Sequence, residues 1–189
     1  ALAESYSKQY GVNARTQTTG ASVENVNLIQ QGKVEIGFIM SDVLSQAVNG
    51  EAPFKEKVEI YQVAAMYDNY MQIVTSQKSG IKTLTDLKGK RVAVGDQGSG
   101  TEVNARTLLE SHGITYNDIK VDYLGFAEAA DALRSGRIDA AVLSSGLPNA
   151  SIMELEQSFD LQLVSIDADK IGEIAKDKSY FHAKEIPAG

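Results

Sequence analysis

A glycine-rich stretch near the middle of the chain carries the residues best suited to hold a small anion. Residues 92–102 read VAVGDQGSGTE, a run of small or β-branched residues followed by glycines and a helix start. Ser99 or Thr101 can cap that helix, and the glycines let the backbone approach a ligand closely. The first N–H groups of a helix lack intrahelical acceptors and lie at the positive end of its dipole. The stretch predicts either an anion-binding turn or only a tight strand-to-helix turn.

Two phosphate-binding motifs are excluded by single residues in this stretch. Thr101 stands where the lysine of a P-loop belongs, and Val103 stands where the third glycine of a dinucleotide-binding turn belongs. A carboxylate or another small anion therefore remains as the expected ligand.

The composition narrows the classes of function. The chain has 189 residues, of which 43% are hydrophobic and 23% charged, which is typical of a soluble globular protein with one large domain or two small lobes. A net charge of −7 argues against nucleic acid as a partner, and no apolar run is long enough for direct membrane insertion. There is no cysteine, and His112 and His182 lie far apart, so no metal site or cofactor is expected. Both ends of the chain read as truncated.

Helix and strand signals alternate along the chain, which predicts an α/β protein with parallel-rich sheets flanked by helices. Helices are expected over residues 1–10, 22–31, 41–49, 83–89, 100–111, 126–135, 149–158 and 168–176. Strands are expected over residues 12–18, 34–40, 58–66, 70–75, 92–94, 121–124, 138–143 and 161–165.

A faint internal repeat and a boundary signal suggest two lobes. Residues 31–41 align with residues 135–145, each reading as a helix stop, a basic residue and a strand that ends in serine. Any αβ unit can share this pattern, so the repeat alone leaves both interpretations open. With the Ser79-Gly80 signal, we expect a first lobe over residues 1–77 and a second over 78–189, with a hinge near residues 75–79.

Several motifs in a fixed order resemble the TAXI family, the solute receptors of TRAP transporters, over nearly the whole chain. The matching stretches are TGASVEN at 19–25, MSDV at 40–43, IKTLTDLKGKRVAVG at 81–95, GSGTE at 98–102, GRIDA at 136–140 and IPAG at 186–189.

The resemblance implies a two-lobed periplasmic binding protein of type II. Such a receptor binds a small carboxylate or an amino acid, such as glutamate or glutamine, between its lobes and delivers it to a TRAP membrane permease. It would be periplasmic or otherwise extracytoplasmic, with a signal peptide upstream, and it would not be an enzyme. The family's first strand is expected before residue 1, so the first lobe is expected to be incomplete.

The helix-start argument and the resemblance together predict a ligand site at the ends of strands facing a cleft. Its members are Thr19, Gly20, Ala21, Ser22, Asn25, Ser41, Asp42, Tyr67, Ser99, Gly100, Thr101, Ser144, Ser145 and Gly146.

Some polar residues allow two readings. Asp42 could receive a ligand ammonium group or cap a helix, and Tyr67 could cover the ligand or be a loop aromatic. Arg106 could clamp a carboxylate, although it lies more than one turn inside its helix. Glu35 and Asp139 fall at strand starts, where structural ion pairs are expected.

Enzymatic readings have little support in the sequence. There is no G-x-S-x-G elbow, and two distant histidines do not suggest a Ser-His-Asp triad. The main alternative is the ligand-sensing domain of a bacterial transcriptional regulator with the same fold, and a small transferase is a further one. A regulator would carry a helix-turn-helix before residue 1, whereas a receptor would carry a signal peptide.

Overall fold

The fold is built on a five-stranded mixed sheet with the strand order β3-β2-β4-β1-β5. The structure is a computed structural model that describes residues 2–186, so residues 187–189 of the predicted IPAG motif lie outside the described part. The strands are β1 (Tyr70–Ser76), β2 (Arg91–Ala93), β3 (Lys120–Asp122), β4 (Ala140–Ser145) and β5 (Leu161–Leu163). Strand β2 runs parallel to β3 and β4, whereas β1 runs antiparallel to β4 and β5.

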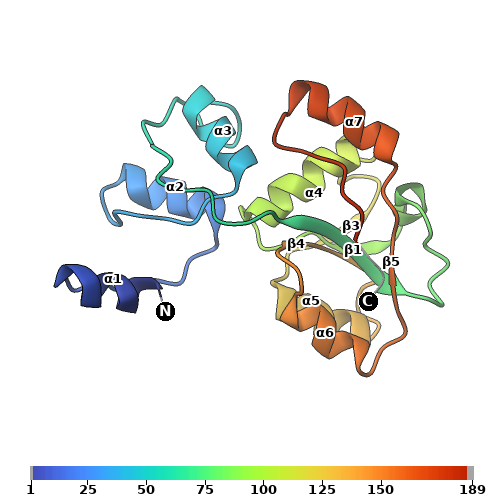
Figure 1. The fold of residues 1–189 in the computed structure, drawn as a ribbon. Helices are drawn as coiled ribbons and strands as arrows, with labels where there is room; N and C mark the ends of the chain where they lie inside the picture. The colour runs from blue at the N-terminus through green and yellow to red at the C-terminus, as the bar shows by residue number, and fades with distance from the viewer. Residues whose placement is uncertain (1, 187–189) are drawn as a thin grey trace.

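Helices cover both faces of this sheet (Figure 1). Helices α4 (Gly100–Ser111) and α7 (Ala168–Asp177) lie over one face, and α5 (Phe126–Arg134) and α6 (Ala150–Glu156) lie over the other. Side chains alternate between the two faces along a strand. In β4, Ala140 and Val142 accordingly join the core beneath α4, while Ala141 and Leu143 join the core beneath α5 and α6.

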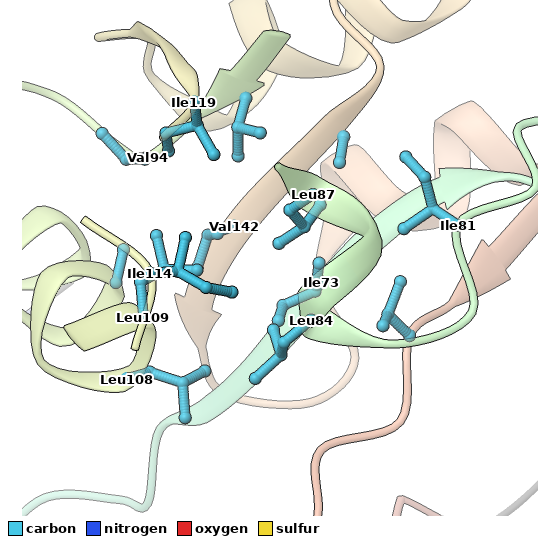
Figure 2. Close-up of a cluster of buried hydrophobic side chains, with 14 residues drawn as sticks. Ile73, Ile81, Leu84, Leu87, Val94, Leu108, Leu109, Ile114, Ile119 and Val142 are labelled. Atoms are coloured by element: carbon cyan, nitrogen blue, oxygen red, sulfur yellow. The ribbon is translucent and has the colours of Figure 1, made fainter. Parts of the chain in front are cut away.

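The larger core lies between the sheet and α4 (Figure 2). Leu108 and Leu109 of α4 pack against Ile73 of β1 and Val142 of β4. The short 3₁₀ helix η1 (Leu84–Leu87) places its two leucines in the same core. Thr83 and Asp86 form a capping box at its start.

The N-terminal part contains helices α1 (Leu2–Tyr10), α2 (Ser22–Gln30) and α3 (Ser41–Asn49), and residues 2–69 contain no strand. Val26 of α2 and Val43 of α3 share a small core with Val103 of α4, which attaches this part to the sheet-containing part.

The predicted strands over 12–18, 34–40 and 58–66 are wrong, because these residues form no ladder in the described chain. A strand is stable only when a neighbour satisfies its backbone N–H and C=O groups. Residues 138–143 have that neighbour in β2 and β1, and residues 34–40 do not. The two copies of the predicted repeat share the helix stop, with Gly32 and Gly136 at positive φ, but only the second copy continues into a strand.

Strand β1 precedes the predicted lobe boundary at residues 77 and 78 yet belongs to the sheet, and the division into two lobes remains a prediction. The predicted hinge at residues 75–79 is wrong at its start. Thr75 is fully buried between β4 and β5, and its Oγ1 donates to the carbonyl of Asp139 at 2.7 Å. The exposed connection between the two parts is formed by residues 61–69 instead.

Candidate functional site

Three helices begin at one place, where the N-terminal part meets α4. The Met40 N–H, at the N-cap of α3, donates to the hydroxyl of Ser22, the first residue of α2, at 3.0 Å. The Val23 N–H donates to the Gly98 carbonyl at 3.3 Å, just before α4. A Cβ on Gly100 would lie 2.8 Å from Met40 Cγ and 2.9 Å from Ser22 Oγ. The positive dipole ends of α2, α3 and α4 are thus gathered together.

The glycine-rich turn has the predicted capping geometry. The Ser99 hydroxyl accepts from the Glu102 N–H at 3.1 Å and caps α4. Gly95 has a φ of +94°, and a Cβ there would lie 2.8 Å from the Thr101 side chain, so the turn requires glycine. Ser99 and Thr101 are both buried. The N–H groups of Gly100 and Thr101 fall in the first turn, where a helix offers no acceptor.

A buried chain of side-chain hydrogen bonds crosses the same interface. The Asn104 amide donates to the Asp42 carboxylate and accepts from the Ser144 hydroxyl at 3.2 Å. Exposed fractions are 3% for Asp42, 8% for Asn104 and 3% for Ser144. This chain connects α3 of the N-terminal part, α4 and the carboxyl end of β4.

Burial raises the pKa of Asp42 to about 6, although hydrogen bonds from the Val43 and Asp42 N–H groups and from Asn104, together with the charge of Lys178, oppose the rise. Asp42 is the second residue of α3 and Met40 is the N-cap, so the reading of Asp42 as the helix cap is wrong.

The predicted residues before α2 hold their own loop together. The Thr19 hydroxyl donates to the Asn25 side-chain oxygen at 2.6 Å, and the Asn25 amide donates to the Phe38 carbonyl at 2.7 Å. The Gly20 N–H donates to the Glu24 carboxylate. Ala21 has a φ of +77°, a conformation that strains a residue with a Cβ. Ser41, the first residue of α3, is exposed.

A second group of predicted residues lies elsewhere. Tyr67, Ser145 and Gly146 border an open depression of about 600 Å³. The Ser145 hydroxyl accepts from the Gln72 and Asn149 amides, at 3.3 and 3.0 Å. Because neighbouring strand residues point to opposite faces, Ser144 faces α4 while Ser145 faces away from it. The structure thus divides the predicted site into two locations.

Arg106 has a structural role. Its guanidinium donates to the buried Glu102 carboxylate, at 2.5 Å from Nη2 and 3.2 Å from Nε, and lies over the Tyr116 ring at 5.3 Å. The predicted structural pair at Asp139 is confirmed, since its carboxylate accepts from Nη2 of Arg91 at 2.7 Å and from Nε at 3.1 Å. Glu35 makes no ion pair in the described part of the chain.

Sequence reasoning missed Asn104 and Met40. Asn104 follows Gly100 by four residues, and this spacing places both on one helix face, which could have pointed to it. Within residues 2–186, no group of three or more His, Cys, Asp or Glu side chains could hold a metal ion. No helix in the same residues is long and apolar enough to cross a membrane.

Comparison with known proteins identifies relatives and the fold. The profile of the NMT1-like family matches residues 1–189. A protein of Escherichia coli strain K12, described as an aliphatic sulfonates-binding protein, is 27% identical over 145 residues. The alignment covers 74% of this chain and 41% of that protein, so the chain spans about two fifths of this curated relative.

Two solved structures share the fold. A binding protein component of an ABC phosphonate transporter from Pseudomonas aeruginosa has a TM-score of 0.63 at 13% identity, covering 93% of this chain and 66% of that one. An ancestral arginine-binding protein bound to arginine has a TM-score of 0.59 at 21% identity, covering 95% and 82%. The predicted α/β periplasmic binding protein fold is confirmed, with a mixed sheet flanked by helices.

Proposed function

Because the chain belongs to the NMT1-like family and has the fold of periplasmic binding proteins, we propose that it is the solute-binding part of an extracytoplasmic receptor. The receptor holds a small anionic solute between the N-terminal part and the sheet-containing part and delivers it to a membrane permease. The convergence of the starts of α2, α3 and α4 at Ser22, Met40 and Gly100 is the observation that carries this proposal.

The anionic group of the solute is bound at the start of α4. The N–H groups of Gly100 and Thr101 serve as donors, and the dipoles of three helices favour negative charge at this point. Carboxylates, sulfonates and phosphonates all present oxygen acceptors to such donors. The Escherichia coli relative described as binding aliphatic sulfonates supports an anionic solute. Glutamate and glutamine remain predictions from the family resemblance.

Access to this position requires the two parts to separate. Gly100 lies against Met40 and Ser22 so closely that even a Cβ does not fit. The solute therefore enters an open form, in which α2 and α3 have moved away from α4, and the exposed residues 61–69 accommodate the movement. Small-angle scattering of the full-length protein is expected to show a more compact form at saturating solute, whereas an unchanged profile would argue for a rigid pocket.

The permease partner has two candidates. The TAXI resemblance predicts a TRAP permease, whereas the similar protein from Pseudomonas aeruginosa is named as part of an ABC transporter. Solute uptake by cells that carry the receptor and its permease distinguishes them. Uptake through a TRAP permease is abolished when the ion gradient is dissipated at constant ATP, and uptake through an ABC transporter follows ATP.

The anion site is tested by removing one hydroxyl at the start of α4. A thermal-shift screen of small carboxylates, sulfonates and phosphonates on the full-length protein first identifies a solute. If the Thr101 hydroxyl donates to the anion, Thr101→Val weakens binding about ten- to a hundredfold in calorimetric titration. Thr107→Val, on the same helix and away from its start, is the matched control. If folded Thr101→Val and Gly100→Val both bind the solute as tightly as the parent, the anion lies elsewhere.

A further inference from the structure

The buried carboxylate of Asp42 has no cationic partner in contact. Its side-chain partner is the neutral Asn104 amide, and no ion pair in residues 2–186 includes Asp42. A buried charge held only by neutral groups is costly. The charged or titratable groups around it are Lys178 and Tyr180, which follow α7, with Glu51 nearby after α3. A ligand cation would supply the missing charge.

Asp42 also lies at a defined place relative to the predicted anion position. Gly100 and Asn104 are four residues apart, so they share one face of α4, about 5–6 Å apart. Gly100 faces Ser22 and Met40, while Asn104 bonds to Asp42. The helix start and the Asp42 carboxylate therefore face the same interface, about one helical turn apart.

On the basis of the proposed function, we propose that Asp42 receives the ammonium group of a solute whose anionic group is bound at the start of α4. The receptor then prefers a zwitterion over a simple anion of the same length. The separation of about one turn suits a solute whose two charged groups lie at opposite ends of a short carbon chain. Asn104 positions the carboxylate, and Ser144 positions Asn104 in turn.

This assignment makes the binding of zwitterions depend on pH. Only the ionised carboxylate attracts an ammonium group. Because burial raises the pKa of Asp42 to about 6, the affinity for a zwitterion falls as the pH drops from 7.5 to 5. The affinity for a simple sulfonate, which remains ionised throughout, does not fall with it.

Calorimetric titration of the full-length protein with matched probes tests the proposal. The probes are 2-aminoethanesulfonate and ethanesulfonate, with 3-aminopropanoate and propanoate as a second pair. The parent is expected to bind each amino compound about ten- to a hundredfold more tightly than its partner. Asp42→Asn removes this preference, and because it also removes a negative charge about one helical turn from the bound anion, ethanesulfonate binds to the variant at least as tightly as to the parent. Asp169→Asn, an exposed aspartate on α7, is the control and keeps the preference.

The outcomes separate the two proposals. If the parent binds both members of each pair equally, or if Asp42→Asn weakens both equally, Asp42 only joins α3 to α4 and the inference is wrong while the receptor proposal stands. If Asp42→Asn changes neither, Asp42 lies outside the site and the inference is again wrong. If the folded parent binds no small carboxylate, sulfonate or phosphonate, both proposals fail.

Discussion

The N-terminal part and the sheet-containing part use similar apolar sequences in opposite ways. Ile36 and Phe38, two residues apart in a predicted strand, are 67% and 63% exposed, whereas Ile73 in β1 is 1% exposed. All three lie in segments with strand-like composition, but only β1 has neighbours on both sides. An apolar, β-branched pattern thus indicates a possible strand, but the strand forms only where a neighbouring strand can pair with it.

The largest expected effect tests this contrast in packing. Leu109→Ala opens a cavity in the core between α4 and the sheet, so the free energy of unfolding should fall by about 2–5 kcal/mol. Phe38→Ser removes an exposed side chain and should change the free energy of unfolding by less than about 0.5 kcal/mol. Urea unfolding measures both. A loss at Phe38 as large as that at Leu109 would mean that residues 34–40 are packed after all.

The next prediction concerns the interface between the two parts. The pKa of Asp42 is raised from 3.8 to about 6, so between these values the folded protein binds more protons than the unfolded chain. Stability therefore decreases as the pH rises from about 4 to about 6 and remains lower above that window. Asp42→Asn should remove this dependence and raise the free energy of unfolding at pH 7 by up to roughly 3 kcal/mol. A variant that is less stable than the parent at pH 7 would contradict it.

A smaller effect is expected within the sheet. Asp139→Asn replaces the carboxylate that accepts from Arg91 at the start of β2, and it should cost about 0.5–1 kcal/mol because both side chains are partly solvated. The Arg91 guanidinium lowers the pKa of Asp139, so the parent loses this contribution as the pH falls through that lowered pKa. The variant should lack the acid-dependent component, as pH-dependent chemical unfolding can show. Equal acid sensitivity in both proteins would exclude a role for the pair.

The smallest expected effect lies in the N-terminal part. Ala21 has a φ of +77°, which glycine adopts without strain. Ala21→Gly should therefore raise the free energy of unfolding by about 0.5–1 kcal/mol, after the flexibility of glycine in the unfolded chain is subtracted. Thermal unfolding checks the sign, and Ala127→Gly, in an exposed position of α5, should destabilise instead.

The sequence was sufficient to predict those structural features that depend only on neighbouring residues. The span 100–111 of α4 follows from its Ser99 cap and the glycine at 113, and the Thr83 and Asp86 capping box follows from spacing alone. Long-range pairing was not predictable in the same way. The local sequence around β1 does not indicate that this strand lies antiparallel between β4 and β5. The local sequence around residues 34–40 likewise does not indicate that they lack a pairing strand.

In the candidate site, too, the features set by local sequence were predictable and those set by long-range packing were not. The start of α4 was predictable, because Ser99 is a recognisable capping residue, whereas its contact with the start of α2 depends on how the two helices pack. The separation of Ser144 from Ser145 depends on the register of β4, which fixes which face each side chain joins. The contact between Asp42 and Asn104 depends on how α3 packs against α4, and no local signal carries that information.

The position of β1 has a mechanical consequence. The backbone that leaves the N-terminal part enters the sheet at an inner strand, between β4 and β5, and not at an edge. A force that draws the N-terminal part away along the direction of β1 loads both neighbouring ladders in shear, so many hydrogen bonds resist it together. Residues 61–69, which have no ladder, extend first under such a load. The connection at residues 61–69 thus extends easily, whereas its attachment to the sheet at β1 resists extension. A displacement of the N-terminal part is therefore transmitted to the centre of the sheet through β1 alone.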